Sequence, residues 1–199
     1  MSKTVLIDSN IFIWGIKGQS TDGQEGMIQK AKDLIEYLTG QGYKLMLPVP
    51  QMVELMSHVP VAEQDQIRLY FDSKFMVVPF DEIAGIKCAE LLHLSLQDEE
   101  IKKLREEGKI PKNKIKYDCM LCAIAIVRGA TKIYSEDDDM RRFAHGQIEV
   151  NKMPTFARAK NLFNEEMNLV EVKQDEGTAK VLDKIQKASE TLKEMKKEK

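Results

Sequence analysis

Four acidic side chains stand where apolar segments end or helices begin, and together they could bind a divalent cation. Asp8 follows the apolar run Thr4–Ile7, and Asp137 follows a shorter apolar segment late in the chain. Glu54 lies early in a helix expected after a second strand, and Asp118 opens an apolar helix. The carboxyl ends of parallel strands border one crevice, so these carboxylates would meet there. Because like charges repel, the cluster needs a counter-ion, and hard oxygen ligands favour Mg²⁺ or Mn²⁺ over zinc.

Each of these acids also has a simpler structural interpretation. Asp8 and Asp118 could cap the helices that follow them, because Asp accepts hydrogen bonds from free backbone N–H groups at helix starts. Glu54 could be an exposed acid favoured by the helix dipole. The SEDDD run that contains Asp137 could be a solvated acidic turn. Their joint occurrence at the same edge of one predicted sheet favours a common site.

The elements that would position these acids alternate between strand and helix along the chain. Apolar runs and helical periodicity predict strands at 3–7, 43–50, 75–80, 131–135 and 148–150, with helices at 27–38, 51–59, 62–74, 81–95 and 118–128. Parallel strands need crossover connections, which helices commonly provide. The pattern therefore predicts an α/β fold, a three-layer sandwich with a central and mostly parallel sheet.

The bulk composition is that of a soluble globular protein. The chain has 199 residues, of which 43% are hydrophobic and 31% charged, with a net charge of −2. This length suits one domain with an appendage. No run approaches the length of a membrane span and no secretory signal is seen at the start, so we expect a cytoplasmic protein without a membrane partner.

The three cysteines are expected to be packed thiols rather than a metal or redox site. Cys119 and Cys122 form a C-x-x-C pair, which raises the alternatives of zinc binding and redox chemistry. They lie in an apolar, helix-like run, and no second pair completes a zinc site; Cys88 stands alone. Buried reduced thiols are therefore the favoured interpretation.

Two charged stretches interrupt the alternating pattern and are expected to lie outside the core. One is a basic insertion at about 96–116, within a domain that spans 1–160. The other is a C-terminal extension, 161–199, expected to be a charged helical tail. Its apolar residues have heptad spacing over barely two heptads: Val181, Ile185, Ala188, Leu192 and Met195. This helix could dock on the body or on a second copy of the chain, or it could be a frayed end.

The order and spacing of the acidic motifs resemble the PIN domain family, most closely in the style of the VapC-type toxin nucleases. The resemblance covers about residues 3–150. It is carried by IDSN at 7–10, the helical Glu54, KYDCMLCAIAIVRGA around Asp118, and IYSEDDDM around Asp137. It implies a PIN-like fold and a metal-dependent ribonuclease, a hydrolase that cuts RNA phosphodiester bonds.

The resemblance also implies roles for individual residues. The metal ligands and catalytic residues would be Asp8, Glu54, Asp118 and Asp137, with Asp139 as an outer or second-metal ligand. Asn10 and Ser135 would support the site. Divalent ions suit this chemistry because they polarise a phosphoryl oxygen, activate water and stabilise the leaving oxygen.

Basic residues near the third motif could meet the charge of the substrate. The candidate RNA-binding residues are Lys109, Lys112, Lys114, Lys116, Arg141 and Arg142. A basic segment that leads into a metal-binding acid would attract phosphates even in a nearly neutral protein. The alternative is a solvated loop whose lysines serve solubility. RNA, rather than DNA, follows from the resemblance alone.

Rival readings come from three other classes. A haloacid-dehalogenase-type phosphatase needs a second Asp where Asn10 stands, and a receiver domain needs adjacent acids where Ile7 precedes Asp8. No G-x-x-x-x-G-K-[ST] motif marks a P-loop. A catalytically silent PIN-like module that binds RNA or protein remains the alternative. An antitoxin or other protein, and a second copy in a homodimer, are further candidate partners.

Overall fold

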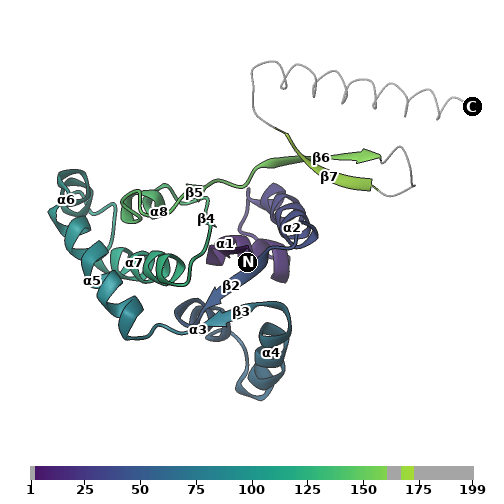
Figure 1. The fold of residues 1–199 in the computed structure, drawn as a ribbon, viewed down its shortest axis with the longest axis horizontal. Helices are drawn as coiled ribbons and strands as arrows, with labels where there is room; N and C mark the ends of the chain where they lie inside the picture. The colour runs from purple at the N-terminus through teal and green to yellow at the C-terminus, as the bar shows by residue number, and fades with distance from the viewer. Residues whose placement is uncertain (1–2, 161–166, 173–199) are drawn as a thin grey trace, which may run out of the picture. The chain divides into compact units, whose positions relative to one another are not determined.

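The computed structural model describes residues 3–160 and 167–172, and its main sheet has five strands. They are β1 (Thr4–Ile7), β2 (Lys44–Pro48), β3 (Met76–Val78), β4 (Lys132–Tyr134) and β5 (Val150–Asn151). The strand order is β3-β2-β1-β4-β5, and all four pairings are parallel. Figure 1 shows helices on both sides of this sheet. The predicted α/β fold with a central parallel sheet is confirmed.

Helices fill the connections between the strands. Their bounds are α1 (Ser9–Phe12), the π-helix η1 (Ile13–Lys17), α2 (Glu25–Gly40), α3 (Val49–Met56), α4 (Val61–Lys74), α5 (Glu82–Gln97), α6 (Glu99–Glu106), α7 (Lys112–Val127) and α8 (Asp138–Phe143). Among the residues that the structure describes, no helix is long and apolar enough to cross a membrane.

The central strand β1 is buried along its whole length because helices cover both faces of the sheet. Leu6 and its neighbours Met46 and Ile133 on the adjoining strands belong to one continuous core with residues of α5 and α7. Side chains alternate along a strand, so Val5 and Ile7, equally buried, point to the other face. The branched apolar run of the sequence thus gives a strand with two dry faces.

The charged stretch 96–116 does not lie outside the core, so that expectation is wrong. It forms the end of α5, all of α6 and the start of α7. Its three isoleucines, Ile101, Ile110 and Ile115, are buried in the main core. The lysines and glutamates between them mark the solvent face of an amphipathic helix pair, which a count of charges alone obscures.

Helix α7 begins earlier than the sequence analysis placed it. Pro111 precedes the first turn, and the helix runs from Lys112, so Asp118 lies in its second turn and does not open it. Ile115, Cys119 and Cys122 share one buried face at helical spacing. This apolar stripe extends the helix back through the lysine-rich segment and excludes the capping interpretation of Asp118.

The chain divides into two compact units, with Met153 closing the first and Pro154 opening the second. The second unit contains an antiparallel pair, β6 (Thr155–Lys160) and β7 (Met167–Val172), in which Thr155 faces Val172. These two strands were not predicted from the sequence. The heptad stripe from Val181 to Met195 lies outside the described residues.

Candidate active site

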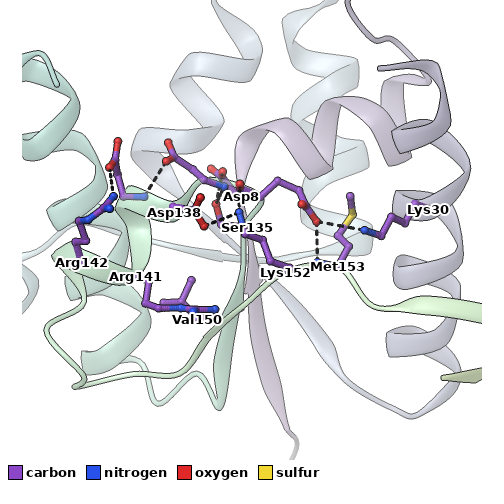
Figure 2. Close-up of polar contacts among 12 residues, drawn as sticks. Asp8, Lys30, Ser135, Asp138, Arg141, Arg142, Val150, Lys152 and Met153 are labelled. Carbon is purple, nitrogen blue, oxygen red and sulfur yellow. Dashed lines mark hydrogen bonds and ion pairs between the residues drawn. The ribbon is translucent and has the colours of Figure 1, made fainter. Parts of the chain in front are cut away.

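Asp8 lies at the carboxyl end of β1 and is held from two sides. Its Oδ1 accepts a 2.7 Å hydrogen bond from the backbone N–H of Ser9, and its Oδ2 accepts a 2.8 Å bond from the hydroxyl of Ser135 (Figure 2). The residue is buried. Burial raises the pKa of Asp8, the two hydrogen bonds oppose this, and the charges of Asp137 and Glu54 add to it. Asp8 therefore both caps α1 and presents a confined carboxylate at the sheet edge.

Glu54 reaches the same edge from α3. Its Oε2 accepts two hydrogen bonds of 2.6 Å, one from the hydroxyl of Ser9 and one from that of Tyr117. Burial, reinforced by the bond to Glu54, raises the pKa of Tyr117 well above its usual range, so the phenol remains a donor. Gln51, one turn earlier and fully buried, donates to the carbonyl of Ile7 at 2.8 Å and fixes α3 to the end of β1. Glu54 is exposed, yet the two hydroxyls position its carboxylate.

Asp118 presents a buried carboxylate oxygen without a partner. The residue is 7% exposed, and its Oδ2 has no hydrogen-bond donor in the part of the chain that the structure describes. Burial, together with the charges of Asp8 and Asp137, raises the pKa of Asp118 to about 8. A buried oxygen without a donor carries the full cost of its desolvation. A bound cation would relieve that cost.

Asp137 and Asp139 form an acidic pair at the start of α8. Asp137 caps the helix by accepting a 2.9 Å hydrogen bond from the N–H of Asp139, and its own N–H donates to Ser135 Oγ at 3.0 Å. The Lys114 ammonium bridges the pair, 2.7 Å from Asp137 Oδ2 and also paired with Asp139 Oδ2. Burial lowers the pKa of Lys114, but these bonds outweigh it and raise the pKa overall. The guanidinium of Arg142 holds the other oxygen of Asp139 at 2.7 Å.

The fold brings these acids close enough to influence one another. The raised pKa of Asp118 reflects, after burial, the charges of Asp8, Asp137 and Asp139. Among the described residues, however, no three acidic, histidine or cysteine side chains converge to hold an ion as they stand. Protein donors occupy the carboxylate oxygens instead, with Lys114 on the acidic pair and hydroxyls on Glu54.

The donor set itself fits a hard divalent cation. The acids offer only carboxylate oxygens, the ligands that Mg²⁺ and Mn²⁺ prefer. The partnerless Oδ2 of Asp118 supplies a buried oxygen that no protein donor in the described ranges satisfies. The chemistry of this donor set fits such an ion, and the assignment of the five acids as ligands stays a prediction.

The supporting residues differ from the expectation in one respect. Ser135 joins Asp8 to the backbone of Asp137, as a supporting residue should. Asn10 is exposed on α1, and no hydrogen bond of its side chain to these acids is found in the described ranges. Ser9 and Tyr117, which the sequence analysis missed, orient Glu54. Both stand directly beside a predicted acid in the sequence, which is the one clue that could have found them.

The six predicted RNA-binding residues fall into different surroundings. Arg141 donates to the carbonyl of Val150 at 3.1 Å, and Arg142 bridges Asp139 and Glu100. Lys114 lies within the acidic pair, and Lys109 pairs with Glu107 at 2.7 Å. Lys112 and Lys116 are exposed on α7. These contacts leave the two exposed lysines as the members of the set most open to a ligand.

A basic hollow lies where α6 meets α7. It has a volume of about 470 Å³ and is lined by Lys102, Arg105, Glu106, Gly108, Ile110, Pro111 and Lys112. Lys112 begins the helix that carries Asp118. Six residues of α-helix span about 9 Å, which separates Lys112 from Asp118 along the helix axis.

The cysteines are packed thiols, as predicted. Cys88, Cys119 and Cys122 are all free and buried. Burial raises the pKa of Cys119 to about 11, which keeps it protonated at neutral pH. Cys122 packs against Met140, with the two sulfur atoms 3.4 Å apart.

Among solved structures, the chain is similar to proteins of VapBC complexes. For VapBC2 from Rickettsia felis bound to a promoter DNA fragment, identity is 17%, coverage 75% of this chain and 98% of that chain, and the TM-score 0.47. For VapBC-1 from nontypeable Haemophilus influenzae, identity is 11%, coverage is 75% of this chain and 98% of that chain, and the TM-score is 0.49. For VapBC-5 from Mycobacterium tuberculosis, a member of the VapBC family of toxin-antitoxin systems, identity is 18%, coverage is 75% of this chain and 97% of that chain, and the TM-score is 0.39. A comparison with curated proteins found no match.

A family model matches most of the chain. It is the model of the PIN domain, and the match covers residues 5–146. This range runs from Val5 of β1 past the end of α8 and therefore includes every acid described above. The chain belongs to the PIN domain family.

Proposed function

We propose that this protein is an endoribonuclease that hydrolyses RNA phosphodiester bonds with Mg²⁺ or Mn²⁺. The observation that carries the proposal is the buried Oδ2 of Asp118, which lacks a donor among the described residues and lies within the electrostatic reach of Asp8, Asp137 and Asp139. Membership of the PIN domain family supports a nuclease. The ligands would be Asp8, Glu54, Asp118 and Asp137, with Asp139 as an outer or second-metal ligand.

The metal, when bound, would supply Lewis-acid stabilisation of the charge that develops on the phosphoryl group. The chain's own residues prepare the site for it. Ser135 and the N–H of Ser9 fix the orientation of Asp8. Ser9 and Tyr117 hold Glu54 by the same oxygen, so its other oxygen stays available as a ligand. Such outer partners typically tune both metal affinity and ligand orientation.

We propose that the basic hollow between α6 and α7 receives the RNA backbone. Arg105 and Lys112 line it, and Lys112 begins the helix that carries Asp118. Phosphate contacts of this kind position a nucleic acid without reading its sequence. The hollow would therefore hold RNA beside the acids, while Arg141 and Arg142 mainly serve the internal contacts described above.

Metal-dependent cleavage of a mixed RNA pool by the purified full chain tests this function. The wild type should cut in Mn²⁺ or Mg²⁺ and stop cutting in excess EDTA. Asp8→Asn and Asp118→Asn should each reduce cleavage by more than about 100-fold. Removing a residue that only hydrogen-bonds to a metal ligand typically costs about 10- to 100-fold. Asp65→Asn, which alters an exposed acid of α4, should cut like the wild type. Cleavage that persists in both site variants would refute the proposal.

The second candidate is a catalytically silent module that binds RNA or a protein. An apolar hollow of about 310 Å³ favours the protein-binding version, since it is lined mainly by hydrophobic side chains: Phe12, Ile16, Lys17, Leu55, Val59, Ile67, Tyr70 and Phe71. An antitoxin or a second copy of the chain is the partner we propose for it. Stable binding of RNA without cleavage in any divalent ion would favour this candidate.

We further propose that the nuclease acts as a VapC-type toxin. Expression of the wild type should then arrest growth, and Asp118→Asn should relieve the arrest. We also propose a cytoplasmic location, where the three free, buried cysteines would stay reduced.

A further inference from the structure

Lys114 occupies an unusual position inside the acidic site. Its ammonium lies 2.7 Å from Asp137 Oδ2 and pairs with Asp139 Oδ2 as well. Lys114 stands four residues before Asp118 on α7, so the two side chains share one face of that helix. A positive charge is therefore fixed at the boundary between α7 and the start of α8, beside the predicted metal ligands.

The Oδ1 atoms of Asp137 and Asp139 each accept a hydrogen bond from the protein. Asp137 Oδ1 accepts the N–H of Asp139, which caps α8. Asp139 Oδ1 accepts from Arg142. The two Oδ2 atoms are the ones left to face an ion, and Lys114 takes both.

We infer that Lys114 is a tethered counter-ion that a divalent cation must displace from Asp137 and Asp139 in order to bind. The inference rests on the proposed function, because it takes the acidic pair as metal ligands. An ammonium and a divalent ion repel each other and need the same oxygens, so their occupancies are mutually exclusive. Lys114 thereby weakens the affinity of the site for metal and sets the ion concentration at which the site fills.

A purely structural role for Lys114 makes the opposite prediction. If the lysine only held the two carboxylates in place, its loss would leave them misoriented and weaken metal binding. The acidic pair has other supports, however, because the α8 cap holds Asp137 and Arg142 holds Asp139. Removing Lys114 should therefore free the Oδ2 atoms without releasing the carboxylates.

Titration of the full chain with Mn²⁺, by calorimetry and by the electron paramagnetic resonance of free Mn²⁺, tests the inference. Lys114→Gln should bind Mn²⁺ about three- to tenfold more tightly than the wild type, the range expected for loss of competing, partly exposed ion pairs. Lys114→Arg keeps the charge and should stay within about twofold of the wild type. Lys103→Gln removes an equal charge from an exposed lysine of α6, outside the residues assigned to metal or RNA, and is the control.

The outcomes separate this inference from the proposed function. Asp118→Asn should lose Mn²⁺ binding, which tests the metal site alone. Suppose that Asp118→Asn loses Mn²⁺ binding but Lys114→Gln binds Mn²⁺ no more tightly than the wild type. Lys114 is then not a competitor, and the inference is overturned while the metal site stands. If the wild type binds no Mn²⁺ that depends on Asp118, the metal site fails and the inference fails with it. Circular dichroism and a second variant, Lys114→Ala, control for misfolding.

Discussion

Ser135 donates its hydroxyl to Asp8 Oδ2 at 2.8 Å, although the two residues lie 127 positions apart in the sequence. They meet because β1 and β4 are parallel neighbours, with Ile7 paired to Tyr134, so that each strand delivers its next residue to the same edge. Both side chains are buried. The same Ser135 oxygen accepts the N–H of Asp137, so one hydroxyl links two predicted ligands.

Ser135→Ala should therefore impair the site without unfolding the protein. We expect metal affinity or cleavage to fall about 10- to 100-fold, the usual effect of removing a partner of a metal ligand. Steady-state cleavage and Mn²⁺ titration would measure it. Ser95→Ala, which removes another buried hydroxyl that is bonded to His145 and not to the acids, should leave cleavage unchanged. Equal losses in both variants would show a general packing effect.

Divalent ions should raise the melting temperature, because a ligand that binds only the native state stabilises it. At an ion concentration 100 times the dissociation constant, the gain is about 2.7 kcal/mol. Asp137→Asn should show a smaller gain, since it removes one candidate ligand. Differential scanning fluorimetry with and without Mn²⁺ would compare the two proteins. An equal shift in both would place the ion elsewhere on the chain.

Without metal, the free energy of unfolding should fall as the pH rises from about 4 to 8. The pKa of Asp118 is raised from 3.8 to about 8 in the folded protein, so the folded state binds more protons than the unfolded state in this window. The stability that this proton confers is complete below pH 4 and is lost as the pH passes 8, with a slope of at most about 1.4 kcal/mol per pH unit.

Urea denaturation in EDTA across this pH range would measure that slope. Asp118→Asn should flatten it, and Asp65→Asn, an exposed acid on α4, should keep it. A slope that is the same in Asp118→Asn and in the wild type would show that Asp118 is not the group responsible.

RNA binding should depend on the basic hollow. The double variant Arg105→Gln/Lys112→Gln should bind RNA more weakly whatever its sequence, and each lost phosphate contact should reduce the salt slope of log affinity by about 0.7. Fluorescence anisotropy at several salt concentrations would measure both. Lys32→Gln/Lys44→Gln removes two exposed lysines elsewhere and serves as the control. An unchanged slope would show that the hollow only faces solvent.

The sheet could be predicted from the sequence, because each strand is marked by the residue types within its own short segment. The run before Asp8 is apolar and branched, and parallel topology then sends Asp8 and Asp137 to the same edge without knowledge of any contact. Asp118 was assigned to the wrong part of its helix, which begins at Lys112, and its assignment to the site stays a prediction. The buried stripe through Ile115 and Cys119, rather than the charges between them, decides where α7 begins.

What the sequence could not predict depends on side-chain partners across elements. The pairing of Lys114 with Asp137 and Asp139 joins α7 to α8, and a lysine in a basic run gives no hint of an internal partner. The bond between Tyr117 and Glu54 likewise joins residues 63 positions apart. Such contacts depend on how separate elements pack together. The residue types and spacing within one segment do not show which side chains will meet.

The buried Oδ2 of Asp118, which has no donor in the described part of the chain, has a consequence for the protein in a cell. A buried carboxyl oxygen without a donor carries the cost of its desolvation until an ion binds, and less stable regions of a protein open locally more often. Proteases act on such opened states. If the proposed metal site fills in the cell, the abundance of the protein would then follow the supply of divalent ions.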